Sequence, residues 1–352
     1  MNSLVGELMN NQEIPVINLE NFDDGTAAEK RRIAKQLDLA CQEVGFFVIE
    51  GHGVCEETMA NTRMMAEKFF AMPLKQKLKV ERPPQKISRG YNKFQDRSLS
   101  YSMGLSAPPD LQEAFAFGPE EFDGSQWIPD QPQTAMLAGN KWPTTPPGFR
   151  STMIKYDQEM RKLGELMLDI LSLALNIDRE YFRTKFNRQS SVARMVRYPA
   201  QEAKPKVGQL RAGAHTDYGT LTFLRGDPVP GGTEIRIKDG RWLEVINPDK
   251  CFVCNIGDAL ARWSNDRWIS TLHRVGNPPS FENSADRISM VYFHSPNHDA
   301  VIECLPGCEG DIGPKYNPIT FADHYLGKVM KAAHLRNNAT IEEARAKDPV
   351  EK

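Results

Sequence analysis

The chain has 352 residues, of which 40% are hydrophobic and 26% are charged, and its formal net charge is −2. This composition is typical of a folded globular protein, and the near-neutral charge gives no reason to expect binding to nucleic acid or to an acidic membrane surface. The N-terminus lacks the basic and apolar regions of a signal peptide, and no apolar run approaches the roughly 18 residues needed to span a bilayer. We therefore expect a cytoplasmic protein with no membrane partner.

In the first 190 residues, short apolar strands alternate with amphipathic helices. The pattern predicts strands over 14–19, 46–49 and 111–118, and helices over 27–44, 56–71, 74–80 and 149–175, followed by a short helix that Asp178 caps and Phe186 ends. Residues 82–112 and 119–148 are predicted to be loops. A loop as long as 82–112 inside a compact domain is usually functional or mobile.

From residue 191 the pattern changes to short runs with period two, bounded by Gly, Pro, Asn and Asp. About nine strands without intervening helices favour a sandwich or jelly roll over a parallel βαβ sheet. The predicted strands are 192–198, 210–214, 221–224, 234–237, 242–245, 252–256, 270–275, 288–293 and 301–304. Residues 319–331 then predict a closing helix, which is a candidate part of a lid.

These patterns predict one compact unit of mixed α/β (α+β) class, built from four segments. Residues 1–120 form a region of helices and strands, 121–190 a loop and a long supporting helix, 191–305 the strand-rich core, and 306–352 a C-terminal helix and tail.

The six cysteines raise the question of a structural zinc site, because Cys251 and Cys254 form a C-x-x-C pair and Cys304 and Cys308 lie four apart. However, residues 251–256 are predicted to form a buried strand, in which positions three apart face opposite sides, whereas a zinc knuckle needs a tight turn. We therefore expect reduced, mostly buried cysteines.

The strongest chemical signal is His215-Thr216-Asp217. In an extended segment, positions i and i+2 face the same side, so the imidazole and the carboxylate can converge on one point. They supply two thirds of a facial triad for non-haem iron, which leaves positions open for substrate and oxygen. A lone histidine is more often a satisfied core residue, but His273 is a candidate third ligand. We call His215, Asp217 and His273 the triad.

A second pair, Arg287 and Ser289, also lies at i and i+2 on a predicted strand, 14 residues after His273. A guanidinium and a hydroxyl on one face suit a carboxylate. On its own this pair says little, but its position in the same strand-rich half as the triad makes it informative.

Taken in order, these residues resemble one known family, the iron(II)- and 2-oxoglutarate-dependent dioxygenases of the isopenicillin-N-synthase-like group. The likeness runs from about residue 14 to residue 330, and it is specific in combination although no single piece is. The motifs that carry it are His215-Thr216-Asp217, His273 after 58 positions, Arg287-Ile288-Ser289, Ile14-Pro15-Val16-Ile17, Glu43-Val44-Gly45-Phe46-Phe47, Glu113-Ala114-Phe115-Ala116-Phe117-Gly118 and Asn255-Ile256-Gly257-Asp258.

The resemblance implies a double-stranded β-helix (jelly-roll) core with flanking helices. It also implies that the triad holds Fe(II), that the C5 carboxylate of 2-oxoglutarate meets Arg287 and Ser289, and that Tyr198 hydrogen-bonds the same cosubstrate. The ketoacid end would chelate the iron and O2 would take the remaining position. The implied reaction converts 2-oxoglutarate to succinate and CO2 while a substrate is oxidised.

Candidate substrate contacts come partly from strand alternation and partly from the family. Arg194 and Val196 share the face of Tyr198, so Arg194 either projects into the pocket mouth or is a structural arginine at the rim. Phe293 either lines the pocket or belongs to the core. The family often covers its substrate with the segment equivalent to 86–106, which adds Arg89, Tyr91 and Phe94.

Three functions remain open from the sequence. The first is a 2-oxoglutarate-dependent oxygenase that hydroxylates, desaturates or cyclises a small organic substrate, such as a metabolite or an intermediate of secondary metabolism. The second is an iron-dependent oxidase on the same fold that needs no ketoacid. The third is a catalytically silent jelly-roll binding protein. The sequence does not fix the substrate or the oligomeric state.

Overall fold

The computed structural model describes residues 14–83, 88–96, 98–105, 107–128, 130–280 and 284–330. Its α-helices are α2 (Ala27–Glu43), α3 (Glu56–Phe70), α4 (Leu74–Lys77), α5 (Phe149–Leu175), α6 (Arg179–Phe186) and α7 (Asp258–Trp263). Residues 321–330 are also helical. Three 3-10 turns are η1 (Leu78–Val80), η2 (Leu99–Met103) and η3 (Pro132–Leu137).

Most strands belong to two sheets. The larger has eight strands in the order β1 (Val16–Asn18), β2 (Phe46–Glu50), β10 (Phe252–Ile256), β7 (Leu221–Gly226), β12 (Arg287–His294), β5 (Val192–Tyr198), β4 (Glu113–Phe117) and β3 (Gly90–Asn92). The smaller has four, in the order β6 (Ala212–His215), β11 (His273–Val275), β8 (Thr233–Arg236) and β9 (Trp242–Glu244). A separate ribbon pairs β13 (Val301–Ile302) with β14 (Ile319–Thr320).

The path of the chain between the sheets defines the architecture. From β5 to β12 the chain passes repeatedly from the larger sheet to the smaller one and back, and each pair of neighbouring strands in this region is antiparallel. This arrangement is a jelly roll, and the predicted double-stranded β-helix core with flanking helices is confirmed. Strands from the first 120 residues complete the larger sheet.

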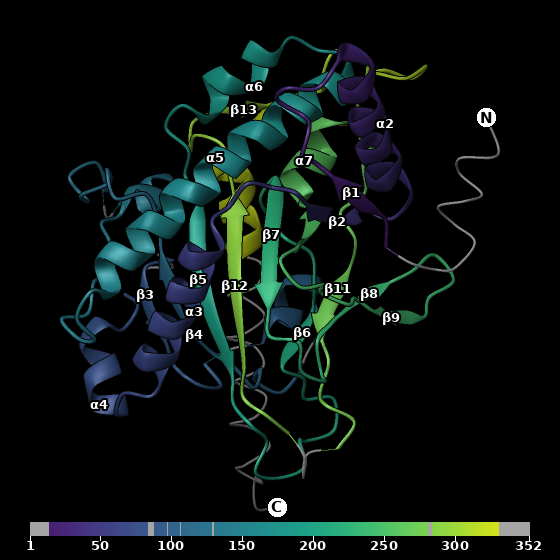
Figure 1. Ribbon diagram of the computed structural model, residues 1–352. Coiled ribbons are helices and arrows are strands. Elements are labelled where there is room, and N and C mark those ends of the chain that lie inside the picture. Colours follow the sequence, from purple (N-terminus) through teal and green to yellow (C-terminus); the bar gives the residue numbers. More distant parts are fainter. Residues whose placement is uncertain are drawn as a thin grey trace, which may run out of the picture.

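The helices cover one face of the larger sheet. Helix α5 packs against α2, α3 and β12, and α3 also packs against β12; Figure 1 shows α3 to the left of that strand. Side chains alternate along β12: Ile288, Met290 and Tyr292 join the helix-covered core, whereas Arg287 and Ser289 point to the other side, toward the smaller sheet. The long helix therefore fixes the strand that carries the predicted carboxylate-binding pair.

Most predicted elements are confirmed, among them α5, β5, β10 and the Asp178 cap of α6, whose side chain accepts a hydrogen bond from the Glu180 amide. The differences are short elements. Strand β3 lies within the segment predicted as a loop, and α7 interrupts the run of strands that we expected to contain no helix. Residues 319–320 pair with β13, so the closing helix begins at residue 321 rather than 319.

The cysteines are all free. Cys254 lies on β10 with its side chain in the helix-covered core. Among the described residues, the one group of three or more His, Cys, Asp or Glu side chains able to hold a metal is the triad. No helix in the described part of the chain is both long enough and apolar enough to cross a membrane.

Candidate active site

The triad converges at the edge of the smaller sheet. His215 ends β6 and His273 begins β11, and the two residues are register partners, so their rings lie side by side with centroids 4.4 Å apart. Asp217 follows two residues after His215, and its Oδ1 lies 3.9 Å from His215 Nε2 and 3.7 Å from His273 Nε2. Ligand atoms that share one ion at about 2.1 Å lie roughly 3 Å apart. A small contraction would therefore complete a common site.

Backbone carbonyls orient both imidazoles. His215 Nδ1 donates to the carbonyl of Gly213 at 2.7 Å, and His273 Nδ1 donates to the carbonyl of Thr271 at 2.9 Å. Because a carbonyl can only accept, the proton of each neutral ring lies on Nδ1 and the lone pair of Nε2 faces Asp217. This is the arrangement in which a second partner holds a metal-ligating histidine.

Two side chains of the larger sheet orient the carboxylate. Asp217 Oδ2 accepts from Thr222 Oγ1 at 2.6 Å and from Asn255 Nδ2 at 2.7 Å, which leaves Oδ1 directed at the imidazoles. Burial alone would raise the pKa of Asp217, but the neighbouring His273 and His215 and the Thr222 hydroxyl hold that pKa well below its usual range. The group is therefore a carboxylate at neutral pH.

The His215 ring is neutral at the same pH. Burial, together with the neighbouring His273, lowers the pKa of His215 to about 4. Burial also acts to lower the pKa of His273, but the adjacent Asp217 carboxylate outweighs it, so that pKa lies above its usual value. Once His273 has lost its extra proton, as a metal ligand must, two imidazoles and one anionic oxygen form a donor set suited to a divalent ion of intermediate softness.

Sequence reasoning missed Thr222 and Asn255, although one signal was present. Asn255 is an amide inside the otherwise apolar strand Phe252–Ile256, and a buried amide needs a hydrogen-bond partner. Its partner could not be identified because it depends on the pairing of β10 with β7, where Asn255 is the register partner of Thr222.

Arg287, Ser289 and Tyr198 form a second cluster. Arg287 is only 3% exposed, its Nη1 donates to Ser289 Oγ, and its guanidinium lies 5.6 Å from the centroid of the Tyr198 ring. Among the described residues no carboxylate lies within 4 Å of the Arg287 guanidinium, and its Nε has no hydrogen-bond partner. A buried cation without an anion is costly, so this cluster is suited to an anionic ligand.

A glycine keeps this cluster open. Gly226 is the register partner of Ser289 on β7, and a Cβ at that position would lie 2.2 Å from Arg287 Nη2 and 3.0 Å from Ser289 Oγ. A side chain there would fill the space beside both donor groups. The sequence gives no sign of this role, because it arises from cross-strand register.

Three of the predicted substrate contacts lie near the triad. The charge of Arg194 acts on both His215 and Tyr198, and it contributes to the low pKa of His215 after burial and His273. Val196 packs with Tyr198 in a small cluster between the sheets. Phe293 is the register partner of Thr222 and shares the β12 face of Arg287 and Ser289.

The structure does not bring the other three candidates to this site. Arg89 is buried and donates to the carbonyls of Ser88, Met136 and Ala138, so its guanidinium is a structural support. The Tyr91 hydroxyl donates to Glu113 in the helix-covered core. Phe94 lies in a turn and is 43% exposed. We do not retain them as substrate contacts.

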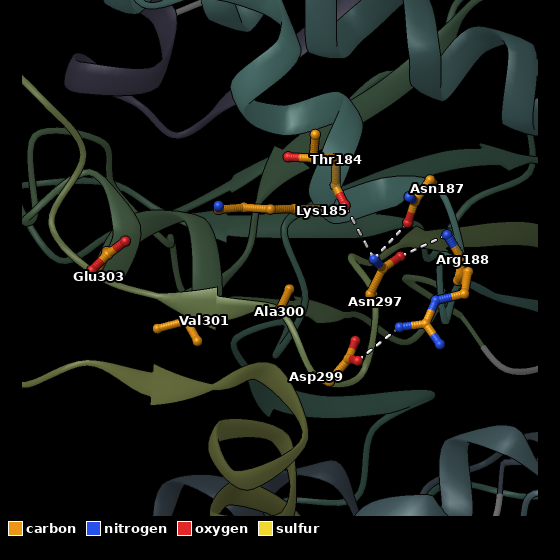
Figure 2. A pocket seen from close by; sticks show the side chains of 9 residues that line it. All are labelled: Thr184, Lys185, Asn187, Arg188, Asn297, Asp299, Ala300, Val301 and Glu303. Carbon is orange, nitrogen blue, oxygen red and sulfur yellow. Dashed lines mark hydrogen bonds and ion pairs between the residues drawn. The ribbon is translucent and has the colours of Figure 1, made fainter.

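A surface cavity of about 460 Å³ lies elsewhere, between the end of α6 and β13, and Figure 2 shows its lining. Several of its polar groups are bonded to one another: Asn297 bonds to Asn187 and to the backbone of Thr184 and Arg188, and Arg188 pairs with Asp299. It shares no lining residue with the triad or with the Arg287 cluster.

Comparisons with known proteins agree with the geometry. Residues 14–145 match the family described as "non-haem dioxygenase in morphine synthesis N-terminal", and residues 188–296 match the "2OG-Fe(II) oxygenase superfamily". A 2-oxoglutarate-Fe(II) type oxidoreductase of Emericella nidulans is 31% identical over 319 residues, covering 89% of this chain and 88% of that protein. A homoarginine-6-hydroxylase of Arabidopsis thaliana is 33% identical over 337 residues, covering 91% of this chain and 97% of the relative.

A solved structure gives the same result. The crystal structure of a full-length Neurospora crassa protein in complex with alpha-KG and thymine superposes with a TM-score of 0.77 at 29% identity, covering 92% of this chain and 97% of that chain. The chain therefore belongs to the 2OG-Fe(II) oxygenase superfamily. It is a non-haem dioxygenase that uses Fe(II), 2-oxoglutarate and O2, and it couples conversion of 2-oxoglutarate to succinate and CO2 with oxidation of a small organic substrate.

Proposed function

We propose that the triad holds the Fe(II), and that Arg287, Ser289 and Tyr198 bind the C5 carboxylate of 2-oxoglutarate. The observation that carries the first part is the convergence of two Nε2 lone pairs and one carboxylate oxygen, each oriented by a second hydrogen bond. The observation that carries the second is the buried guanidinium with no carboxylate partner among the described residues.

The residues of this chain would divide the work as follows. When bound, the iron supplies the centre at which the ketoacid and O2 react. His215, Asp217 and His273 would hold the ion and leave positions open for both the ketoacid and O2. Thr222 and Asn255 would keep Asp217 Oδ2 occupied, so that the carboxylate binds through Oδ1 alone. Arg287 and Ser289 would set the distance at which the ketoacid end meets the iron.

We further propose that the substrate is a small polar molecule with a carboxylate or carbonyl oxygen that accepts hydrogen bonds from Arg194. Phe293 would form an apolar wall beside it, close to Thr222. The names of the relatives support this choice, because homoarginine carries a carboxylate and thymine carries carbonyl oxygens. Hydroxylation of an unactivated C–H bond is the simplest outcome. The near-neutral charge supports action on a small molecule in the cytoplasm rather than on nucleic acid or at a membrane.

The test of the iron and cosubstrate assignment is an anaerobic titration of the Fe(II)-loaded protein with 2-oxoglutarate. We expect a weak visible charge-transfer band from the chelated ketoacid, and its loss in His215→Ala, Asp217→Ala and His273→Ala. Wild-type binding in any of these variants would remove that residue from the triad. Iron binding without a band would favour the ketoacid-independent oxidase.

The test of the substrate assignment is succinate formation that depends on an added substrate. In a screen of small carboxylates and nucleobases, Arg194→Met should raise the KM of the best substrate by on the order of tenfold or more, because a charge-assisted hydrogen bond is lost. The matched control is Arg188→Met, which removes a guanidinium paired with Asp299 at the surface cavity. Equal effects of the two substitutions would contradict a role for Arg194 in binding.

A further inference from the structure

A second buried arginine lies close to the proposed carboxylate site. Arg211 has no exposed surface and precedes β6. Its Nη1 donates to the carbonyls of Pro230 and Gly231 at 2.8 and 2.9 Å, and its Nη2 donates to the carbonyl of Ala285 at 2.9 Å. Backbone carbonyls rather than an acid therefore hold this cation between the loop after β7 and the start of β12.

Three acids act on the two arginines from more than 4 Å away: Asp286 on Arg211, and Asp227 and Glu244 on Arg287. Two of them are engaged with other partners. Asp286 accepts from Arg197 Nε and Nη2 at 2.9 and 2.7 Å, and from the Ala200 amide. Asp227 accepts from Arg63 Nε and Nη2 at 2.6 and 2.9 Å. Within the described part of the chain, neither Arg211 nor Arg287 forms an ion pair within 4 Å.

The charge of Arg287 acts on the buried Arg211. Burial, and next the charge of Arg287, lower the pKa of Arg211 to about 10, so both guanidiniums stay protonated at neutral pH. Two buried positive charges thus interact, and neither has an ion-pair partner within 4 Å among the described residues. A second carboxylate entering this region would compensate both charges, whereas a ligand with a single carboxylate at the iron would leave them unpaired.

We propose that Arg211 is a specificity-determining residue for the cosubstrate. Its charge, added to that of Arg287, selects the dianion 2-oxoglutarate over 2-oxo acids that carry a single carboxylate. The inference rests on the proposed role of Arg287 and Ser289 in binding the C5 carboxylate. It gives Arg211 an electrostatic function besides the structural one that its carbonyl contacts define.

The experiment compares two ketoacids that chelate the iron in the same way. 2-Oxoglutarate and 2-oxobutyrate are titrated by calorimetry into the anaerobic Fe(II)-loaded protein, and the ratio of their Kd values is the readout. We expect Arg211→Met to raise the Kd of 2-oxoglutarate by on the order of five- to tenfold and to leave the Kd of 2-oxobutyrate within about twofold. Arg211→Lys keeps the charge but not the planar fork, so we expect lower stability with a ratio near that of the wild type.

A matched control separates the loss of the arginine charge from the loss of structural support. Arg89 is also buried and held by backbone carbonyls, and Arg89→Met should lower stability without changing the ratio. Equal weakening of both ketoacids by Arg211→Met, an unchanged ratio, or loss of selectivity in the charge-retaining Arg211→Lys would overturn the proposal.

The same titrations separate this inference from the proposed function. If Arg287→Met lowers the ratio and Arg211→Met does not, only the role of Arg211 is wrong. If Arg287→Met leaves the ratio unchanged, the carboxylate site itself is wrong. If Arg211→Met fails to fold, Arg211→Gln gives the same comparison, because an amide can still donate to the backbone carbonyls but carries no charge.

Discussion

Gly226→Ala is the most informative single change, because it adds one methyl group beside the proposed carboxylate site. The new Cβ would lie 2.2 Å from Arg287 Nη2 and 3.0 Å from Ser289 Oγ. Non-bonded carbon contacts require roughly 3.5 Å, so the guanidinium must retreat by about 1 Å or more. A hydrogen bond of about 2.9 Å does not survive such a displacement.

We expect Gly226→Ala to weaken the binding of 2-oxoglutarate and to change the stability of the fold little. The displaced atom is the end of a flexible side chain, so the folded state can adapt at little cost. A bound carboxylate that loses its charged partner loses on the order of 2–5 kcal/mol. Because Arg287 is moved and not removed, we expect the lower end, which is a rise of about 30-fold in the Kd of 2-oxoglutarate.

The assay is the anaerobic titration of the visible band, with thermal denaturation alongside. Gly232→Ala is the control, since its added methyl would meet only Glu244 Oε1, at 3.7 Å. A Gly226→Ala protein that binds 2-oxoglutarate as tightly as the wild type would refute the carboxylate assignment. A large loss of stability would refute the argument that the guanidinium can move freely.

Three further predictions concern the support of the site and the fold. Asn255→Leu removes a hydrogen-bond donor to Asp217 and should weaken Fe(II) binding by on the order of 10- to 100-fold in a chelator competition. The control Cys254→Ala changes a side chain that faces the helix-covered core and should leave Fe(II) binding unchanged. Equal losses in the two variants would contradict the orienting role of Asn255. Burial, and next the charge of Arg161, hold the pKa of His294 at about 3, below the 6.5 of an exposed histidine, so the unfolded chain takes up a proton first as the pH falls. The free energy of unfolding should therefore fall by about 1.4 kcal/mol per pH unit between pH 6 and pH 4 from this group; urea denaturation of His294→Leu should lack that part of the slope, and an unchanged slope would show that another group causes it. Asp178→Ala removes the cap of α6 and should cost about 1 kcal/mol in the same assay, and a change below about 0.3 kcal/mol would mean that the cap contributes little.

The sequence was most informative where the chemistry is local. His215 and Asp217 lie two positions apart, and so do Arg287 and Ser289, so strand alternation alone brings each pair to one face. Long periodic elements such as α5 were predicted for the same reason. Elements as short as β3 and α7 span too few residues for a period to appear, and the partner strand or a neighbouring turn decides their structure.

The supporting residues could not be predicted because they depend on register between distant strands. Asn255 reaches Asp217 only because β10 pairs with β7, and Gly226 borders Arg287 only because β7 pairs with β12. Arg89 was predicted to contact the substrate, and the structure places its side chain elsewhere. A basic residue in a long loop resembles a substrate contact in sequence, but here its donors serve backbone carbonyls.

The triad draws its support from both layers of the jelly roll. His215 and His273 belong to the smaller sheet, whereas Asp217 is tied through Thr222 and Asn255 to the larger one. An ion bound by all three would thus act as a cross-link between the two layers, much as a disulfide joins the sheets of other sandwiches. Chelation should then loosen one layer from the other, and hydrogen exchange should speed up at the amides of β6 and β11 while those of α5 stay protected.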